Sequence, residues 1–248
     1  MPDTSLLKIS EREIRTHGPG HALAVCWRQW RTERRLARRG IHFRDTNLDN
    51  VAAAYRAMTA QEFDAINGRQ DWANWRTIPR ALSGHVPDRP LRILDLGCGT
   101  GSSTRVLAWY APAASHITAY EIAAPLLEIA RRRDYRHSGG AAARVDFVLQ
   151  RVTEKLRLAD GEAVPDHSVD VVNASGVVGH HLDMVTVLPL VKELSRVLGP
   201  GGIAMLDVGP TVMEGSLRNL MEAEGFEFQG HYRSGWWDPT GQVVFRKT

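Results

Sequence analysis

The chain has 248 residues, of which 43% are hydrophobic and 24% are charged, with 22 glycines and 12 prolines. This composition is typical of a globular domain, so it excludes a disordered chain, a collagen and a coiled coil. Basic residues outnumber acidic ones by 31 to 28, too small an excess to predict a nucleic-acid partner by itself. No run approaches the ~18 apolar residues of a membrane span, and the start of the chain lacks a signal-peptide core. We therefore expect a soluble cytoplasmic protein without a membrane partner.

The first third of the chain has helical periodicity and no convincing strand. The pattern predicts helices over residues 3–15, 21–39, 47–66 and 72–82. The second helix has apolar residues at roughly helical spacing, which we expect to form its buried stripe, with arginines on the solvated face. They are Leu23, Trp27, Trp30 and Ala37. Large aromatic residues usually pack against another part of the protein, which predicts that residues 1–85 form a helical lid.

From residue 90 onward, strands alternate with helices. Strands are predicted over residues 91–96, 116–120, 145–149, 169–173, 203–208, 226–232 and 242–246. This alternation predicts an α/β fold with a parallel sheet and right-handed crossovers. The last two strands are close together in the sequence and predict an antiparallel edge. We therefore expect residues 90–248 to form one domain around a seven-stranded, mostly parallel sheet.

A glycine-rich loop follows the first of these strands, with the sequence Asp95-Leu96-Gly97-Cys98-Gly99-Thr100-Gly101. Glycines let the backbone turn sharply and approach a ligand, and the helix that follows offers unpaired amides. Glu121 stands at the end of the second strand, where a carboxylate can accept hydrogen bonds from both hydroxyls of a ribose. Strand, loop, helix, strand and acid in this order predict an adenosine-containing cofactor.

The loop departs from the G-x-G-x-x-G spacing of nicotinamide and flavin sites, because its third glycine comes one residue early. It resembles the first motif of the class I S-adenosylmethionine-dependent methyltransferases. The resemblance continues through residues 117–130 ("ITAYEIAAPLLEIA"), 168–182 ("SVDVVNASGVVGHHL") and 194–202 ("LSRVLGPGG"). It covers residues 90–248 and implies a Rossmann-like fold with S-adenosylmethionine as the cofactor.

The resemblance also implies which residues bind the cofactor. They are Asp95, Gly97, Gly99, Thr100, Gly101, Glu121, Ile122, Gln150, Arg151, Asn173 and Ala174. Relatives usually have Gly-Asp after the third strand, where the acid binds the adenine amino group, whereas this chain has Gln150-Arg151. Gln150 offers an amide oxygen, but Arg151 cannot accept a hydrogen bond.

The acceptor site is expected just past the fourth strand, where open α/β sheets place their ligands. His180 and His181 lie there, and a neutral imidazole could remove a proton from the acceptor. The alternative is that one or both histidines are structural. Tyr55, Trp72 and Trp236 are the aromatic candidates for substrate contact, with a role in the core as the alternative.

The sequence lacks the motifs of several other classes of methyltransferase and of metal sites, which disfavours those functions. DNA amino-methyltransferases carry an N/D-P-P-Y/F motif, where this chain has Asn173-Ala174-Ser175-Gly176. Cys26 and Cys98 lie far apart without C-x-x-C spacing, and no paired metal ligands appear. We expect a metal-independent O- or N-methyltransferase that acts on a small molecule. The alternatives are an RNA methyltransferase that grips phosphates with the arginines of residues 28–39, and a non-catalytic cofactor-binding protein.

Overall fold

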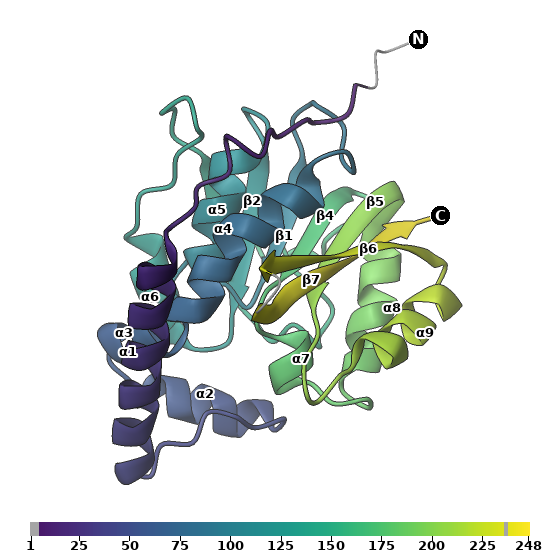
Figure 1. The fold of residues 1–248 in the computed structure, drawn as a ribbon. Coiled ribbons are helices and arrows are strands. Elements are labelled where there is room, and N and C mark those ends of the chain that lie inside the picture. Colours follow the sequence, from purple (N-terminus) through teal and green to yellow (C-terminus); the bar gives the residue numbers. More distant parts are fainter. Residues whose placement is uncertain (1–4, 236–237) are drawn as a thin grey trace.

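The computed structural model describes residues 5–235 and 238–248, which form a central sheet with helices on both faces (Figure 1). The strands lie in the order β3-β2-β1-β4-β5-β7-β6. Their bounds are β1 (Arg92–Leu96), β2 (His116–Glu121), β3 (Arg144–Leu149), β4 (Val169–Ala174), β5 (Leu198–Asp207), β6 (Phe226–Gly235) and β7 (Asp238–Lys247). Strands β1 to β5 pair in parallel, and β7 pairs antiparallel with both β5 and β6. The predicted seven-stranded, mostly parallel sheet with an antiparallel edge is confirmed.

The described helices are α1 (Pro19–Arg38), α2 (Leu48–Arg56), α3 (Ala60–Ile66), α4 (Gly68–Leu82), α5 (Ser102–Tyr110), α6 (Ala124–Arg131), α7 (Val178–His181), α8 (Val187–Val197) and α9 (Glu214–Ala223). Helices α4, α5 and α6 contribute to the hydrophobic cluster on one face of the sheet, and α8 and α9 to that on the other. None of the helices in the described ranges is long and apolar enough to cross a bilayer.

Both faces of the central strands are buried, as the apolar runs of a parallel sheet require. Ile93 faces the cluster that contains α4 and α5, whereas its neighbour Leu94 faces the cluster that contains α8. The sheet is thus covered on both sides, and its carboxyl edge is left for a ligand.

The predicted helix over residues 3–15 is wrong for the part that the structure describes. Leu6 instead forms an antiparallel bridge to Pro87, and the amide of Leu7 donates to the carbonyl of Val86 at 2.9 Å. Hydrogen bonds to a distant segment satisfy this backbone, so local periodicity could not decide its conformation. The predicted helix over residues 47–66 is two helices, because Thr59 and Glu62 form a capping box that starts α3.

The expected buried stripe of α1 is also wrong. Leu23, Trp27 and Trp30 are exposed, and the buried side chains of this helix include Val25 and Leu36. Both sets recur at helical spacing, so the sequence pattern fits either face. The contacts with α3 and α4 select the face with the smaller side chains.

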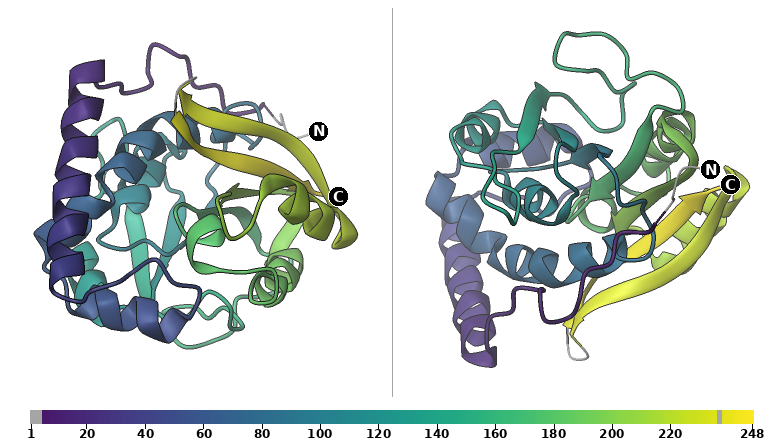
Figure 2. Two further views of the ribbon diagram at one scale, coloured as in Figure 1. Left: turned by 60° about the horizontal axis from the view of Figure 1, so that its bottom comes forward. Right: turned by 90° about the horizontal axis from the view of Figure 1, so that it is seen from above.

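Helices α1, α2 and α3 stand at the end of the sheet where the parallel strands finish. Figure 1 shows α2 beside α7 at the lower edge, and Figure 2 shows α1 and α2 framing that edge from two sides. Val51, Tyr55 and Phe63 join Ala123 and Leu126 of the sheet domain in one hydrophobic cluster. Helices α2 and α3 therefore pack against the carboxyl edge with α1 beside them, while α4 is part of the layer on the sheet.

Candidate functional site

The glycine-rich loop turns through left-handed backbone at three positions. Gly97, Gly99 and Gly101 have φ angles of 71°, 55° and 89°, a region that disfavours residues with a Cβ atom. A Cβ on Gly97 would lie 2.3 Å from a methyl of Val177, and one on Gly99 would lie 2.6 Å from the Phe63 ring. The glycines therefore allow two apolar side chains to close over the loop.

The Asp95 side chain holds the glycine-rich loop in place through hydrogen bonds and does not line a described cavity. Its fully buried carboxylate accepts hydrogen bonds from Ser103 Oγ (2.8 Å), Thr104 Oγ1 (2.6 Å) and Asn173 Nδ2 (2.7 Å). Burial raises the pKa of Asp95, and these three bonds oppose that shift. Gln242 in turn donates to the Asn173 side chain at 2.6 Å, so a polar network joins β1, β4 and β7.

A first cavity of about 570 Å³ opens between the carboxyl edge and the N-terminal helices. Its lining comes from the sheet loops and from α2 and α3, which are far apart in the sequence. The lining residues are Leu48, Val51, Tyr55, Phe63, Asn67, Gly97, Glu121, Ile122, Gln150, Arg151, Val152, Ser175, Gly176, Val177 and His181.

Glu121 is 3% exposed and reaches this cavity from the end of β2. One carboxylate oxygen accepts from the amides of Ile122 (2.9 Å) and Ala123 (2.8 Å), and the other accepts from Gly99 at 2.9 Å. Burial raises the pKa of Glu121, and the three amides oppose that shift. The oxygen bonded to Gly99 retains a lone pair for a ligand hydroxyl.

Gln150 and Arg151 are tied to neighbouring segments. Gln150 donates to the carbonyl of Lys155 at 2.8 Å and accepts from the amide of Arg157 at 3.1 Å. Arg151 forms an ion pair with Asp49 of α2. This pair joins the loop after β3 to α2 across the cavity mouth.

The residue set of the first cavity fits an adenosyl ligand. Glu121 supplies a carboxylate for hydroxyls, Gln150 an amide, and Ile122, Leu48 and Val51 apolar surface. Of the other residues predicted for the cofactor, Arg151 and Gly97 line this cavity. The remaining ones do not line it, and Thr100 donates instead to Asp64 at 2.6 Å.

A second cavity of about 900 Å³ adjoins the first. The two share Tyr55, Asn67, Gly176 and His181 as a common wall. The other lining residues of the second cavity are Gln29, Glu33, Phe43, Arg44, Ile66, Arg69, Gln70, His180 and Pro210. The two cavities therefore adjoin at Tyr55 and His181.

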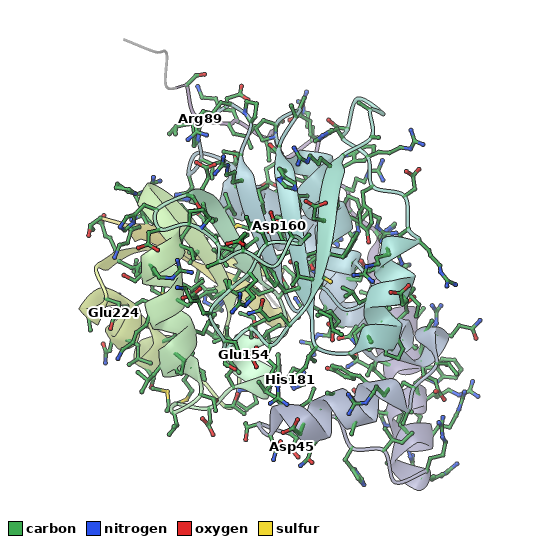
Figure 3. All side chains as sticks on the ribbon, turned by 180° about the vertical axis from the view of Figure 1, so that it is seen from behind. Asp45, Arg89, Glu154, Asp160, His181 and Glu224 are labelled. Carbon is green, nitrogen blue, oxygen red and sulfur yellow. The ribbon has the colours of Figure 1, made fainter. Side chains whose placement is uncertain are left out.

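The Tyr55 hydroxyl lies 2.8 Å from Nε2 of His181, and both side chains are buried. The other ring nitrogen of His181 lies 3.3 Å from the carbonyl oxygen of Asp45. Figure 3 shows Asp45 and His181 next to each other. Because a carbonyl only accepts, Nδ1 carries the proton of the neutral ring and Nε2 accepts from Tyr55. Burial lowers the pKa of His181 and raises that of Tyr55, so both are neutral near pH 7.

Asp207 at the end of β5 positions the helix that carries His181. Its carboxylate accepts from the amides of Val177, Val178 and Gly179 at 2.8 to 2.9 Å. Asp207 and Phe63 were both missed from the sequence. The position of Asp207, a carboxylate at the end of the fifth strand, could have identified it as a site residue. Phe63 could not be identified in this way, because its pattern is that of an ordinary core residue of a helix.

Of the remaining predicted residues, His180 and Trp72 do not line the first cavity. His180 is exposed and lines the second cavity. Trp72 is buried in α4 with the Arg76 guanidinium 3.8 Å from its ring centre, and it lines neither cavity. Trp236 lies outside the described residues. Within the described ranges no three acidic, histidine or cysteine side chains form a group able to hold a metal ion.

Comparison with known proteins agrees with this arrangement. Residues 93–202 match a family described as "Methyltransferase domain". An uncharacterized protein of Synechococcus is 34% identical over 200 residues, which are 77% of this chain and 45% of that protein. The chain therefore spans less than half the length of this curated relative.

Two solved structures share the fold. A TehB-like methyltransferase from Corynebacterium glutamicum is 18% identical, with a TM-score of 0.50 over 93% of this chain and 100% of that one. A methyltransferase from Mesorhizobium loti is 17% identical, with a TM-score of 0.51 over 73% of this chain and 99% of that one. These two likenesses concern the fold, whereas the family match and the motifs of the loop show that the chain belongs to the class I S-adenosylmethionine-dependent methyltransferases.

Proposed function

We propose that this protein transfers a methyl group from S-adenosylmethionine to an oxygen or nitrogen atom of a small molecule, without a metal ion. The observation that carries the proposal is the Tyr55–His181 pair in the wall shared by the two cavities. The first cavity holds the cofactor in this proposal, and the second holds the acceptor. The two free cysteines suit a reducing compartment, and we propose a cytoplasmic location.

The residues of the first cavity bind and orient the cofactor. Glu121 would accept hydrogen bonds from the ribose hydroxyls, and Ile122 and Val51 would supply an apolar surface for the adenine. When bound, S-adenosylmethionine supplies an electrophilic methyl group on a sulfonium, whose sulfur keeps the electron pair of the broken bond. The protein's task is to align the acceptor with that methyl group and to exclude water.

Tyr55 and His181 move the acceptor's proton. As the acceptor atom bonds to the methyl group, its proton passes to the Tyr55 oxygen while the Tyr55 proton passes to Nε2 of His181. The raised pKa of Tyr55 makes a free tyrosinate unfavourable, so the two transfers are concerted. The carbonyl of Asp45 then stabilises the protonated ring.

An RNA acceptor is the alternative for the same chemistry, since α1 carries five exposed arginines. The second cavity, which adjoins the first, favours a small molecule. Incubation with methyl-labelled S-adenosylmethionine and a fractionated extract separates these cases. We expect the label in a small molecule. Label in RNA would support the alternative, and cofactor binding without any transfer would support a non-catalytic role.

A further inference from the structure

Helix α1 presents a stripe of large apolar side chains to solvent. Leu23, Trp27 and Trp30 are 73%, 58% and 51% exposed. They are three to four residues apart, so they lie on one side of the helix. The opposite side, with Val25 and Leu36, is buried. The helix is therefore already anchored in the fold, and its exposed stripe is not needed for folding.

The same side of α1 is strongly basic. Arg31, Arg34 and Arg38 lie on this side, and Arg28 and Arg35 lie at its flank toward the buried side; all five are exposed. The guanidinium of Arg31 lies 4.6 Å from the ring centre of Trp27, and that of Arg34 lies 4.8 Å from the ring centre of Trp30. Glu33, the one acid of this helix, is ion-paired with Arg44 at 2.8 Å. The face therefore combines apolar side chains with uncompensated positive charge.

We propose that this face of α1 docks on a bilayer surface that contains anionic phospholipids. Tryptophan side chains favour the headgroup level of a membrane, leucine inserts below it, and arginine binds phosphate. Charge complementarity selects an anionic surface over a neutral one. The lack of a membrane-spanning run in the sequence predicts no membrane partner, but docking on a bilayer surface needs no such run.

Shape and chemistry favour lipid over single-stranded RNA as the partner. Proteins that bind single strands use a basic groove with open aromatic faces for base stacking. Helix α1 is instead a convex rod along the outer edge of the molecule (Figures 1 and 2). Guanidinium groups already cover one face of each indole, and Leu23 has no stacking surface to offer a base. The proposal does not depend on the proposed methyl transfer.

Cosedimentation of the full chain with vesicles tests the proposal. We expect binding to vesicles of phosphatidylcholine and phosphatidylserine in a 7:3 ratio, and much weaker binding to phosphatidylcholine alone. Replacing Arg31 and Arg34 together by Gln should weaken binding by about 25-fold, about five-fold for each charge. Leu23→Ser should weaken it by about ten-fold, since a buried leucine is lost.

Two control variants match these changes elsewhere on the surface. Val185 is 74% exposed, so Val185→Ser removes an apolar side chain as accessible as Leu23. Arg144 is an exposed arginine at the amino end of β3, away from the carboxyl edge of the sheet. Val185→Ser and Arg144→Gln should bind vesicles like the unaltered chain. Thermal unfolding checks that every variant is folded.

Three results would overturn the proposal. The first is no binding to anionic vesicles at low salt, and the second is equal binding to neutral and anionic vesicles. The third is α1 variants that bind as well as the two controls. If an oligouridine probe binds in an α1-dependent way while vesicles do not, the partner of this face is nucleic acid and the lipid proposal is wrong.

Discussion

The Tyr55 hydroxyl donates to Nε2 of His181 over 2.8 Å, although the two residues are 126 positions apart in the chain. Tyr55 comes from an N-terminal helix and His181 from the helix after β4. Their contact is where the N-terminal helices and the sheet domain complete one site. The proposed mechanism depends on this contact, because Tyr55 takes the acceptor's proton only while its own proton passes to His181.

Removing either member of this pair should slow the reaction with little effect on cofactor affinity. We expect kcat of Tyr55→Phe and of His181→Asn to fall by about 100-fold, the lower range for general acid–base catalysis. The double variant should be no slower than the slower single variant, because the two act as one relay. Initial rates of S-adenosylhomocysteine release, with the identified acceptor, measure this.

His180→Asn serves as the comparison for that experiment. His180 is exposed at the second cavity, so its loss should leave most of kcat. A large loss in His180→Asn together with full activity in His181→Asn would assign the base to His180. Full activity in all of these variants would mean that methyl transfer needs no base.

The pH dependence of the rate should reflect a buried imidazole. Burial lowers the pKa of His181 below the ordinary value of about 6.5. Only the neutral ring accepts a proton, so kcat should be more than half of its plateau value at pH 6.5, with its inflection in more acidic solution. An inflection at or above pH 7 in the kcat profile would contradict this environment.

His181 also links stability to pH. Its folded pKa is depressed, so the unfolded chain binds a proton more readily. The stability gained from the neutral ring is present above about pH 6.5 and is lost as the pH falls toward the depressed value. The unfolding free energy, followed by urea titration, should therefore decline less in His181→Asn than in the unaltered chain over this range.

Gly99 should not tolerate a side chain. Gly99→Ala places a Cβ in left-handed backbone, at a cost of about 1–2 kcal/mol, and pushes it against the Phe63 ring. We expect lower stability by at least about 1 kcal/mol and a loss of cofactor binding. Gly139→Ala is the control, because nothing lies within 4 Å of its added Cβ. Equal denaturant midpoints for the two variants would show that the close approach at Gly99 is unimportant.

The ion pair of Arg151 and Asp49 should hold α2 over the bound cofactor. We expect the cofactor to slow amide hydrogen exchange in residues 45–67, and Arg151→Gln to reduce that protection. The pair is exposed, so stability should change by less than about 1 kcal/mol. Arg136→Gln breaks a comparably exposed pair with Asp134 and should leave the exchange of residues 45–67 unchanged.

Sequence reasoning was most successful where neighbouring residues decide the structure. The apolar run of β1, the glycines after it and Glu121 at the end of β2 all lie where the motifs predict. The contacts of Phe63 with the loop and of Tyr55 with His181 were not predicted. They depend on how the N-terminal helices pack against the sheet domain, and no local sequence pattern predicts that packing.

Helix α1 shows a second limit of the sequence pattern. Large aromatic residues predicted a buried stripe, but the structure buries Val25 and Leu36 and exposes Trp27 and Trp30. Periodicity predicts that an amphipathic helix forms here. The shape of the neighbouring helices decides which side of that helix is buried. That exposed stripe is the basis of the proposed membrane contact.

The most direct test of the account is calorimetric titration of S-adenosylhomocysteine into the full chain and into Glu121→Gln. The account predicts one site per chain and a 10- to 100-fold weaker affinity in Glu121→Gln, from the loss of charge-assisted hydrogen bonds of about 1.5–3 kcal/mol. Glu128→Gln, an exposed change on α6, should bind like the unaltered chain. No binding by the unaltered chain, or equal affinity in all three proteins, would contradict the assignment of the first cavity to the cofactor.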